Sequence, residues 1–235
     1  MKTYVIGDIH GCLTSLKTVL ENTPITAQDR LIFVGDYIDR GPDSKGVIDY
    51  LLKVQQEYSC EFLMGNHEEK FLLSRVYDFE IKEWYGFWDA QATMDSYGTD
   101  DIEQIPESHW EFLRKLCLFI EDERFIYVHA TLEPDVELQR QQSHTLIHQK
   151  LKDPQPHCSG KIVICGHTAQ KNHLPLDKGH TLCIDTDAGR DGWVTCLCTN
   201  TGTYWQANEQ AEYRQGVISS LSREHNQCET VSNET

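Results

Sequence analysis

Five short apolar runs, each followed by an oxygen-bearing or imidazole side chain, constrain the fold more than any other feature of this sequence. The clearest is the run at 31–34, which Gly35 and Asp36 follow directly. Short apolar runs that end at a glycine are typical of buried strands in a parallel sheet, and open α/β sheets keep their sites at the carboxyl ends of their strands. The runs are 4–6, 31–34, 62–64, 125–128 and 162–165, and the side chains that follow them are Asp8, His10, Asp36, Asn66, His129 and His167.

These strand-end side chains predict a metal site. A single Asp after a strand often caps the next helix, but the recurrence of such residues at five strand ends argues against that explanation. Asp, Asn and His without a cysteine ligand suit two borderline-hard divalent ions; we expect manganese, with iron, zinc and nickel as alternatives. Asp36 follows the central strand, so its carboxylate is placed to bridge the two ions.

A pair of ions suits in-line displacement at phosphorus, in which both ions hold phosphate oxygens and the hydroxide between them attacks. Three further residues lie beside the ligands in the sequence. His67 is placed to protonate the leaving oxygen, and Asp39 to orient it by a hydrogen bond. Arg40 has the forked guanidinium geometry that holds phosphoryl oxygens.

The bulk composition argues against several partners. The 235 residues are enough for one compact α/β domain. The formal net charge of −16 argues against a nucleic acid or an anionic membrane as partner, since both are bound through Lys and Arg. The nine cysteines include no Cys-x-x-Cys pair. With neither a signal peptide nor a long apolar span in view, we expect a cytoplasmic protein with reduced thiols and no structural zinc.

Helical and strand patterns alternate at the start of the chain. Apolar residues recur at helical spacing over 12–22, after Pro42 and after the strand at 61–64, which predicts parallel strands with right-handed crossovers. Residues 77–108 break this order with aromatic-rich segments. We expect a helical or irregular insertion there that packs over one side of the sheet, with most of its aromatic residues in the core.

The rest of the chain predicts a second sheet of a different kind. We expect a helix at 109–118, a strand at 124–128, and a long polar loop over 133–160 with a short helix near 143–151. Strands at 161–165, 181–184, 193–198 and 202–206 follow at short intervals, which favours an antiparallel second sheet. The remaining residues are polar and weakly patterned. They predict a marginal helix and a disordered tail at 208–235, after a catalytic domain at 1–207.

The remaining histidines and two later aspartates have weaker patterns. His148 is the best candidate among these histidines for a role in the site, because of its placement in the loop at 133–160. Asp185 and Asp187 fit a turn. The other histidines, which lie in polar contexts and are expected on the surface, are His109, His144, His157, His173 and His180.

The motifs that carry this chemistry resemble those of a known family. Gly-Asp-Ile-His-Gly at 7–11, Gly-Asp-Tyr-Ile-Asp-Arg-Gly at 35–41 and Gly-Asn-His-Glu at 65–68 resemble the three signature motifs of the calcineurin-like metallophosphoesterases. The sequences around His129 and His167 resemble the two later histidine motifs. The arginine of the second motif is similar to that of the phosphoprotein phosphatase branch, which includes bacterial and phage phosphatases and the related symmetrical diadenosine tetraphosphatases. The resemblance covers roughly residues 1–205.

This resemblance implies a four-layer α/β/β/α sandwich and a role for each motif residue. His67 would be the general acid, with Asp39 as its partner. Arg40 would clamp the phosphate, and Asn66 is expected to contact the substrate as well. The first metal would be held by Asp8, His10 and Asp36, and the second by Asp36, Asn66, His129 and His167.

The sequence departs from the family pattern around the phosphate. Met64 stands where family members often have an arginine. A second phosphate-binding arginine, usual in bacterial members, is missing, and by spacing Lys150 or His148 occupies its region. A lysine attracts phosphate as a point charge without the paired hydrogen bonds of arginine, so Lys150 is a candidate substrate-binding residue.

Three functions fit these observations. The first is a metal-dependent phosphomonoesterase that acts on phosphoserine or phosphothreonine in proteins, with phosphotyrosine as a variant. The second is hydrolysis of a dinucleoside polyphosphate of the diadenosine tetraphosphate type at the same centre. The third is a phosphate-binding module with weak catalysis, which the complete set of ligands together with His67 disfavours.

Overall fold

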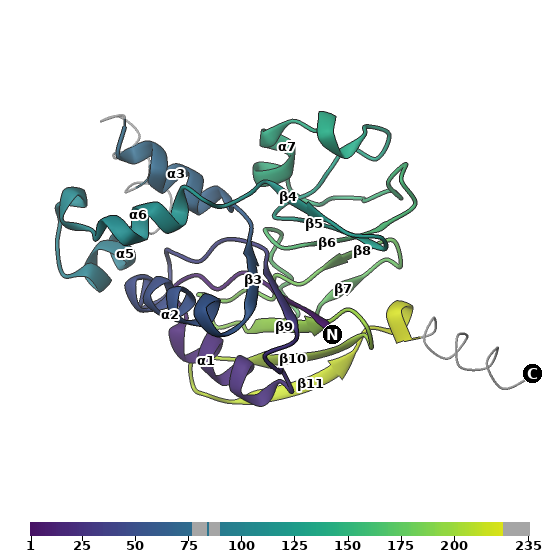
Figure 1. Cartoon of the computed structure of the whole chain (residues 1–235), viewed down its shortest axis with the longest axis horizontal. Coiled ribbons are helices and arrows are strands. Elements are labelled where there is room, and N and C mark those ends of the chain that lie inside the picture. Colours follow the sequence, from purple (N-terminus) through teal and green to yellow (C-terminus); the bar gives the residue numbers. More distant parts are fainter. Residues whose placement is uncertain (77–83, 85–89, 223–235) are drawn as a thin grey trace, which may run out of the picture.

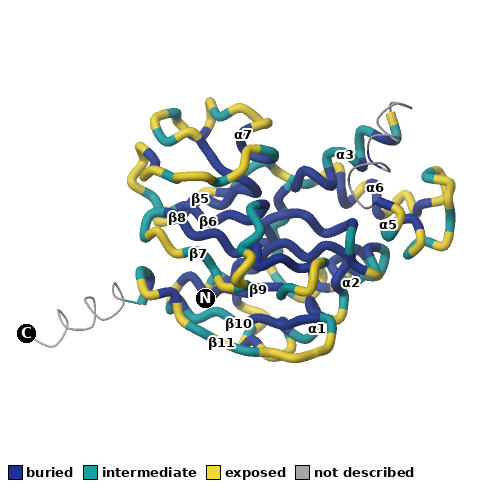
Figure 2. The backbone as a smooth tube through the Cα atoms, turned by 180° about the vertical axis from the view of Figure 1, so that it is seen from behind, coloured by how far each residue is buried: buried dark blue, intermediate teal, exposed yellow. Residues whose placement is uncertain are grey.

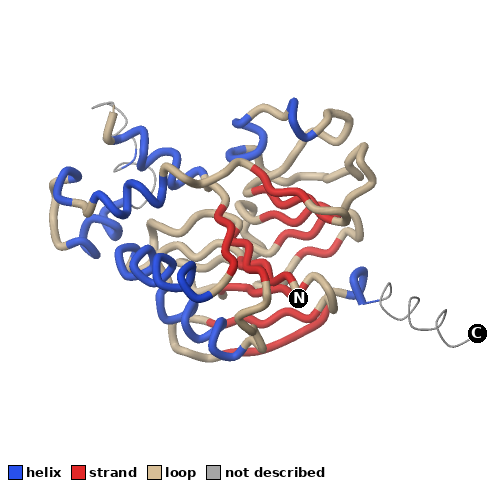
Figure 3. Tube along the Cα trace, viewed as in Figure 1, coloured by secondary structure: helices blue, strands red, loops and turns tan. Residues whose placement is uncertain are grey.

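Two β-sheets stacked face to face, with helices on their outer faces, form the framework of the protein (Figures 1 and 3). A computed structural model describes residues 1–76, 84 and 90–222. The first sheet has the strand order β11-β10-β9-β1-β2-β3, and the second has the order β4-β5-β6-β8-β7. This arrangement confirms the predicted α/β/β/α sandwich.

The first sheet combines three parallel strands from the start of the chain with three antiparallel strands from its end. β1 (Thr3–Ile6), β2 (Arg30–Phe33) and β3 (Ser59–Phe62) pair in parallel, as predicted. Between them run α1 (Leu13–Asn22) and α2 (Ser44–Glu57), and α3 (Asn66–Ser74) follows β3. The antiparallel strands are β9 (Val194–Cys198), β10 (Thr203–Ala207) and β11 (Tyr213–Val217).

The second sheet has a parallel centre with antiparallel edges. β5 (Phe125–Val128), β6 (Ile162–Cys165) and β8 (Thr181–Cys183) are parallel, whereas β4 (Phe119–Glu121) and β7 (Leu176–Asp177) are antiparallel to their neighbours. The helices that precede or cross over this sheet are α5 (Ala90–Tyr97), η1 (Ile102–Gln104), α6 (Glu107–Leu113), η2 (Leu138–Arg140) and α7 (Ser143–His148).

The core follows the two-residue alternation of the strands. On β1, Tyr4 and Ile6 face α1 and α2, whereas Val5 lies between the two sheets with Leu182. A third apolar cluster, which includes Val128, joins the second sheet to α7. Successive side chains of a strand point to opposite faces, so a strand buried on both faces reads as a continuous apolar run. Figure 2 shows this burial along the strands of both sheets.

Several predictions for the second half of the chain are wrong. The second sheet is not a purely antiparallel set: β6 and β8 pair in parallel, and β9 and β10 join the first sheet instead. The apolar pattern shows that such strands are buried but not which sheet they enter. β4 lies where the sequence predicts no strand, and the helix predicted at 109–118 ends at Leu113.

The marginal helix and tail predicted over 208–235 are wrong at residues 213–217, whereas residues 219–222 are helical. Residues 213–217 form β11, which pairs with β10 along its whole length. It is an edge strand whose side chains are exposed or half-buried, so its sequence lacks the continuous apolar run of a buried strand. Residues 223–235 lie outside the described residues, and so do residues 77–83 and 85–89 of the predicted insertion.

Two histidines predicted on the surface are buried, namely His109 and His157. Each has hydrogen-bonding partners inside the fold. His109 contacts the Tyr97 hydroxyl at 2.7 Å, and His157 Nε2 lies 2.9 Å from the carbonyl of Val136. The polar sequence around them masks this burial. The cysteines of the described residues are free, and among those residues no helix combines the length and the apolar character that a membrane span requires.

Candidate metal centre

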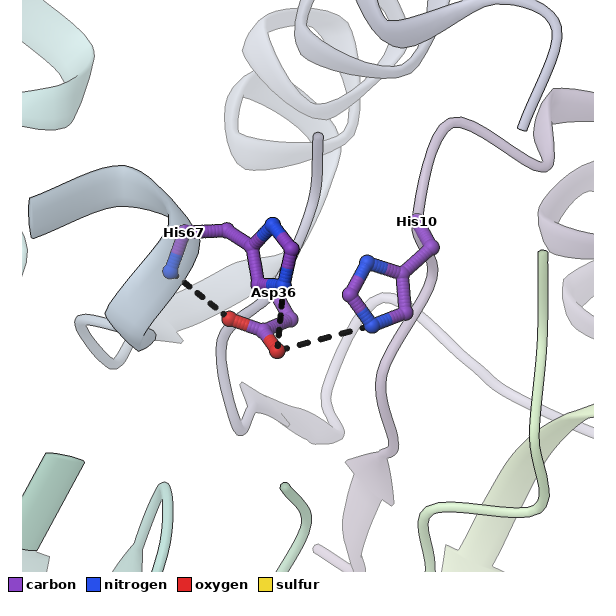
Figure 4. Close-up of side chains that lie close together, drawn as sticks. All are labelled: His10, Asp36 and His67. Carbon is purple, nitrogen blue, oxygen red and sulfur yellow. Dashed lines mark hydrogen bonds and ion pairs between the residues drawn. The ribbon is translucent and has the colours of Figure 1, made fainter. Parts of the chain in front are cut away.

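The predicted ligands come together where strands of both sheets end. Asp36, which follows β2, lies at the centre of the group. Its Oδ2 is 3.5 Å from His10 Nε2, which follows β1, and its Oδ1 is 3.4 Å from His129 Nε2, which follows β5. His129 Nε2 also lies 3.1 Å from Asn66 Oδ1, at the start of α3. Figure 4 shows Asp36 between His10 and His67.

Two groups of side chains within the described residues have metal-ligand spacing, and both contain Asp36. One consists of His10, Asp36 and His67, and the other of Asp36, His129 and His167. In each group, the potential ligand atoms lie within 4.8 Å of one another, and all five residues are buried. Asp36 is therefore the residue that the two groups share.

The tautomers of the histidines fit bound cations. His10 Nδ1 lies 3.0 Å from the carbonyl of Ile38, and His129 Nδ1 lies 2.8 Å from the carbonyl of Val34. A carbonyl only accepts, so each Nδ1 carries the proton and each Nε2 turns its lone pair toward Asp36. A lone pair that faces a carboxylate is favourable when a cation lies between them, so the residues present fit divalent ions.

The electrostatics of the site also favour cations. Burial lowers the pKa of His10 and of His129, and it lowers the pKa of His167 to about 3, so the three imidazoles are neutral, as metal ligands must be. Burial and the carboxylate of Asp185 raise the pKa of Asp8.

Asp8 lies at the edge of the centre rather than inside either group. Its carboxylate accepts hydrogen bonds from the backbone amide of His167, at 3.2 Å to Oδ1 and 3.0 Å to Oδ2. Asp8 therefore links the end of β1 to the end of β6, across the two sheets. His67, predicted as the general acid, belongs to the first group, with 4.0 Å between its Nε2 and Asp36 Oδ2.

The backbone of the centre is strained. Five site residues other than glycine have positive φ angles, which side chains with a Cβ rarely adopt: His10, Asp36, Asp39, Arg40 and His167. Such strain persists only where surrounding contacts hold it, and it clusters at functional sites.

One of those contacts comes from Glu68, the last residue of the motif at 65–68, for which no role was predicted. The buried carboxylate of Glu68 accepts from the amides of Asp36 at 2.9 Å, Tyr37 at 2.7 Å and Gly65 at 3.1 Å. It thus holds the loop that carries Asp36 against the start of α3. Its place three residues after Gly65, at the first turn of a helix, is the signal that could have identified it.

Of the predicted catalytic residues, His67 belongs to the first group, and Asp39 and Arg40 lie beside it. His67 Nδ1 lies 2.7 Å from Asp39 Oδ2. Arg40 Nη2 is 3.2 Å from His67 Nε2, and Arg40 Nη1 is 2.5 Å from His10 Nε2. Lys150 lies beside the second group, where its Nζ donates to the carbonyl of His167 at 2.6 Å. His148, the other residue considered for this region, accepts at its own carbonyl from His167 Nε2, at 3.0 Å.

A two-sheet α/β sandwich with carboxylate, amide and imidazole groups at its strand ends defines a class of metal-dependent phosphoesterases. The family of calcineurin-like phosphoesterases matches residues 1–171, and the chain belongs to this family. Divalent metal ions are the cofactors of this family.

Relatives by sequence cover only part of the chain. A protein of Pseudomonas putida (strain W619) named bis(5'-nucleosyl)-tetraphosphatase, symmetrical, is 30% identical over 135 residues, which are 57% of this chain and 43% of the relative. A protein of the same name from Cellvibrio japonicus (strain Ueda107) is 45% identical over 69 residues, which are 29% of this chain and 25% of the relative. The chain thus spans less than half the length of these curated relatives.

Solved structures share the fold across nearly the whole chain. A cold-active protein-tyrosine phosphatase of a psychrophile Shewanella species superposes with a TM-score of 0.62 at 15% identity, over 91% of this chain and 80% of that one. A protein serine/threonine phosphatase from Saccharomyces cerevisiae gives a TM-score of 0.53 at 17% identity, over 86% and 74% of the chains. At these identities the likeness concerns the fold alone.

Proposed function

We propose that this protein is a metal-dependent phosphomonoesterase that removes phosphate from alcohols and phenols, as found in phosphoserine, phosphothreonine and phosphotyrosine. One observation carries the proposal: the buried pair of His67 and Asp39 stands beside two ligand groups that share Asp36. An alkoxide is a poor leaving group, so its departure depends on a proton donor. An acid of this kind, beside a phosphate-binding centre, is what such esters require.

Seven residues would bind the cations and the substrate. Asp36 would bridge the ions, and Asn66 would bind both an ion and a phosphate oxygen. When bound, the ions would supply Lewis acidity to the phosphoryl oxygens and to the attacking water. The residues that would hold them are Asp8, His10 and Asp36 for the first ion, and Asp36, Asn66, His129 and His167 for the second, with Arg40 beside them.

The chain itself supplies the proton and orients the phosphate. Asp39 keeps a proton on His67 Nδ1, so that Nε2 is the nitrogen that exchanges a proton with the leaving oxygen. Arg40, in contact with that same Nε2, is placed to hold phosphoryl oxygens next to it. Lys150 adds a positive charge on the opposite side, next to His129 and His167.

A second candidate function is hydrolysis of a dinucleoside polyphosphate. The names of the relatives from Pseudomonas and Cellvibrio favour it. In that reaction the leaving group is a nucleotide phosphate, which departs with less help from an acid. The dependence of the rate on His67 is therefore a measurable difference between the two candidates.

The test compares both substrate classes in one preparation. The protein is stripped with a chelator, checked by elemental analysis, and reloaded with manganese. A phosphoserine peptide, a phosphotyrosine peptide and diadenosine tetraphosphate are then assayed in parallel. We expect turnover only after reloading, with higher kcat/KM for a phosphopeptide. A higher kcat/KM for diadenosine tetraphosphate would select the second function, and full activity of metal-free protein would exclude both.

A further inference from the structure

The buried carboxylate of Asp39 has more partners than its role beside His67 requires. Oδ2 accepts from His67 Nδ1 at 2.7 Å and from Trp84 Nε1 at 3.0 Å. Oδ1 accepts from the hydroxyl of Thr93 at 2.6 Å. Asp39, Trp84 and Thr93 are all fully buried. Three donors converge on one carboxylate, and both of its oxygens are engaged.

The direction of each hydrogen bond around Thr93 follows from counting protons. The amide of Asp39 donates to Thr93 Oγ1 at 2.9 Å and to Ser44 Oγ at 3.0 Å. Thr93 has one hydroxyl proton, and the carboxylate of Asp39 only accepts, so that proton goes to Oδ1. In the 3.0 Å contact between the two hydroxyls, Ser44 is therefore the donor. The Thr93 hydroxyl thus accepts from the Asp39 amide and donates to the Asp39 carboxylate.

Both additional donors come from the segment predicted as an insertion. Trp84 and Thr93 lie 45 and 54 residues after Asp39. Thr93 is on α5, which lies beside α2 (Figure 1), and the Lys45 amide donates to Ser96 Oγ on the same helix at 3.0 Å. Trp84 is fixed by packing against Phe71 of α3, with 4.7 Å between the ring centroids. This segment therefore contacts the Asp39 carboxylate through two side chains, Trp84 and Thr93.

We propose that Thr93 and Trp84 are positioning residues that set the orientation of the Asp39 carboxylate and, through it, the tautomer and aim of His67. This inference rests on the proposed acid role of His67. Asp39 has a positive φ angle. Its carboxylate turns freely about the Cβ–Cγ bond unless hydrogen bonds hold its oxygens. Among the described residues, Thr93 is the side chain that donates to Oδ1. Without it, no side chain in the described part of the chain donates to Oδ1.

The first experiment uses the manganese-loaded full-length protein and two substrates, phenyl phosphate and 2,4-dinitrophenyl phosphate. Thr93→Val keeps the shape of the side chain but removes the hydroxyl. We expect kcat on phenyl phosphate to fall by about 10- to 100-fold, since small displacements of a catalytic group are costly, and to change by about twofold or less on the dinitrophenyl ester. KM and metal content should stay unchanged. Trp84→Phe should show the same selective loss.

Two variants serve as controls. Thr93→Ser keeps the hydroxyl and should restore kcat on phenyl phosphate to near the wild-type value. Ser96→Ala lies on the same helix. It loses the hydrogen bonds of the Ser96 hydroxyl with the Lys45 amide and with the backbone carbonyl of Thr93, but it keeps the Thr93 hydroxyl that donates to Asp39. It should leave the ratio of the two rates unchanged. A similar loss in Ser96→Ala, or an equal loss on both substrates in Thr93→Val, would overturn the proposal and reduce Thr93 to a packing residue.

A second readout does not depend on turnover. In metal-free protein labelled with ¹⁵N, the Nδ1–H signal of His67 is identified by its loss in His67→Asn. In Thr93→Val it should shift and exchange faster with solvent, whereas in Ser96→Ala it should not move. An unmoved signal in Thr93→Val would overturn the proposal. If His67→Asn itself loses activity equally on both esters, the acid role fails, and that result is distinct from a failure of Thr93 alone.

Discussion

His67 is the residue whose neighbours most restrict its chemistry. It contacts Asp39 through Nδ1 and Arg40 through Nε2, and it stays within 4.0 Å of Asp36. A general acid needs a proton on Nε2, whereas a metal ligand needs a lone pair on that nitrogen. The two roles are separable by experiment.

We expect His67→Asn to lower kcat by about 10²- to 10⁴-fold on esters with poor leaving groups, the usual contribution of general acid–base catalysis. The loss should be much smaller on nitrophenyl phosphate, whose leaving group needs no proton. Metal content, measured by elemental analysis, should be unchanged. A loss of metal would instead assign His67 to the first ligand group.

Substitutions of Lys150 test whether this lysine helps to bind phosphate in place of a second arginine. Lys150→Ala should raise KM for a phosphopeptide, and Lys150→Arg should leave it unchanged or lower it, because a guanidinium adds two aligned hydrogen bonds. Arg40→Ala should raise KM more than Lys150→Ala does. Steady-state kinetics on the three variants provide the measurement.

The structure adds a competing role for Lys150, since its Nζ donates to the carbonyl of His167. If this bond serves only to hold the loop of His167, then Lys150→Ala should lose metal rather than substrate affinity. Unchanged kinetic constants in both lysine variants would leave Arg40 as the main side chain that binds phosphate.

At the scale of elements, the turn into α3 shows how closely the strand ends approach one another. A Cβ added at Gly65 would lie 2.2 Å from Asp36 Oδ1 and 2.4 Å from the Asp36 amide, far inside contact distance. The added Cβ would also lie 2.6 Å from Glu68 Oε2, whereas the φ of Gly65, −92°, suits any residue. Its conformation is ordinary, and its proximity to Asp36 is the constraint.

Gly65→Ala should therefore displace Asp36 and reduce binding of both ions, because both ligand groups contain that carboxylate. We expect metal content and kcat to fall together, with kcat down by about 10²-fold or more. Gly98→Ala is the control: its φ of +69° is strained, but apart from its chain neighbours no described residue has an atom within 4 Å of the added Cβ. It should cost about 1–2 kcal/mol of stability and leave metal content intact. Full metal content in Gly65→Ala would contradict this account.

At the scale of the whole molecule, the end of the described chain closes the core between the sheets. Ile218 and Leu221, which follow β11, are buried in the same cluster as Val5 and Leu182. A catalytic domain that ends at residue 207 would lack them, along with the strand that covers the edge of β10. The domain boundary is thus open to a direct test.

A chain that ends at residue 222 should be more stable than one that ends at residue 207. Burial of two large aliphatic side chains contributes about 3–6 kcal/mol, at 1.5–3 kcal/mol for each. Urea unfolding of the two truncated chains measures the difference. Equal free energies of unfolding would show that 1–207 is a complete domain and that β11 is an addition to it.

The sequence alone predicted the features that depend on neighbouring residues. Strands β1, β2, β3, β5 and β6 were predicted from their apolar runs, and the alternation with helices predicted their parallel pairing in the first sheet. The polar residues at their ends identified the centre, because parallel strands bring their carboxyl ends to one edge whatever the rest of the chain does. Asp36 was placed between the two ligand groups by the same argument.

The tertiary structure decided what depends on residues far apart in the chain. β9 and β10 join the first sheet because the edge of β1 is open to pairing. An apolar pattern shows that a strand is buried, but not which strand it pairs with. Asp8 meets the amide of His167 across 159 residues, and Thr93 reaches Asp39 from a segment without a strand-end pattern. Such contacts leave no periodicity in the sequence, because they are specified only when separate elements pack together.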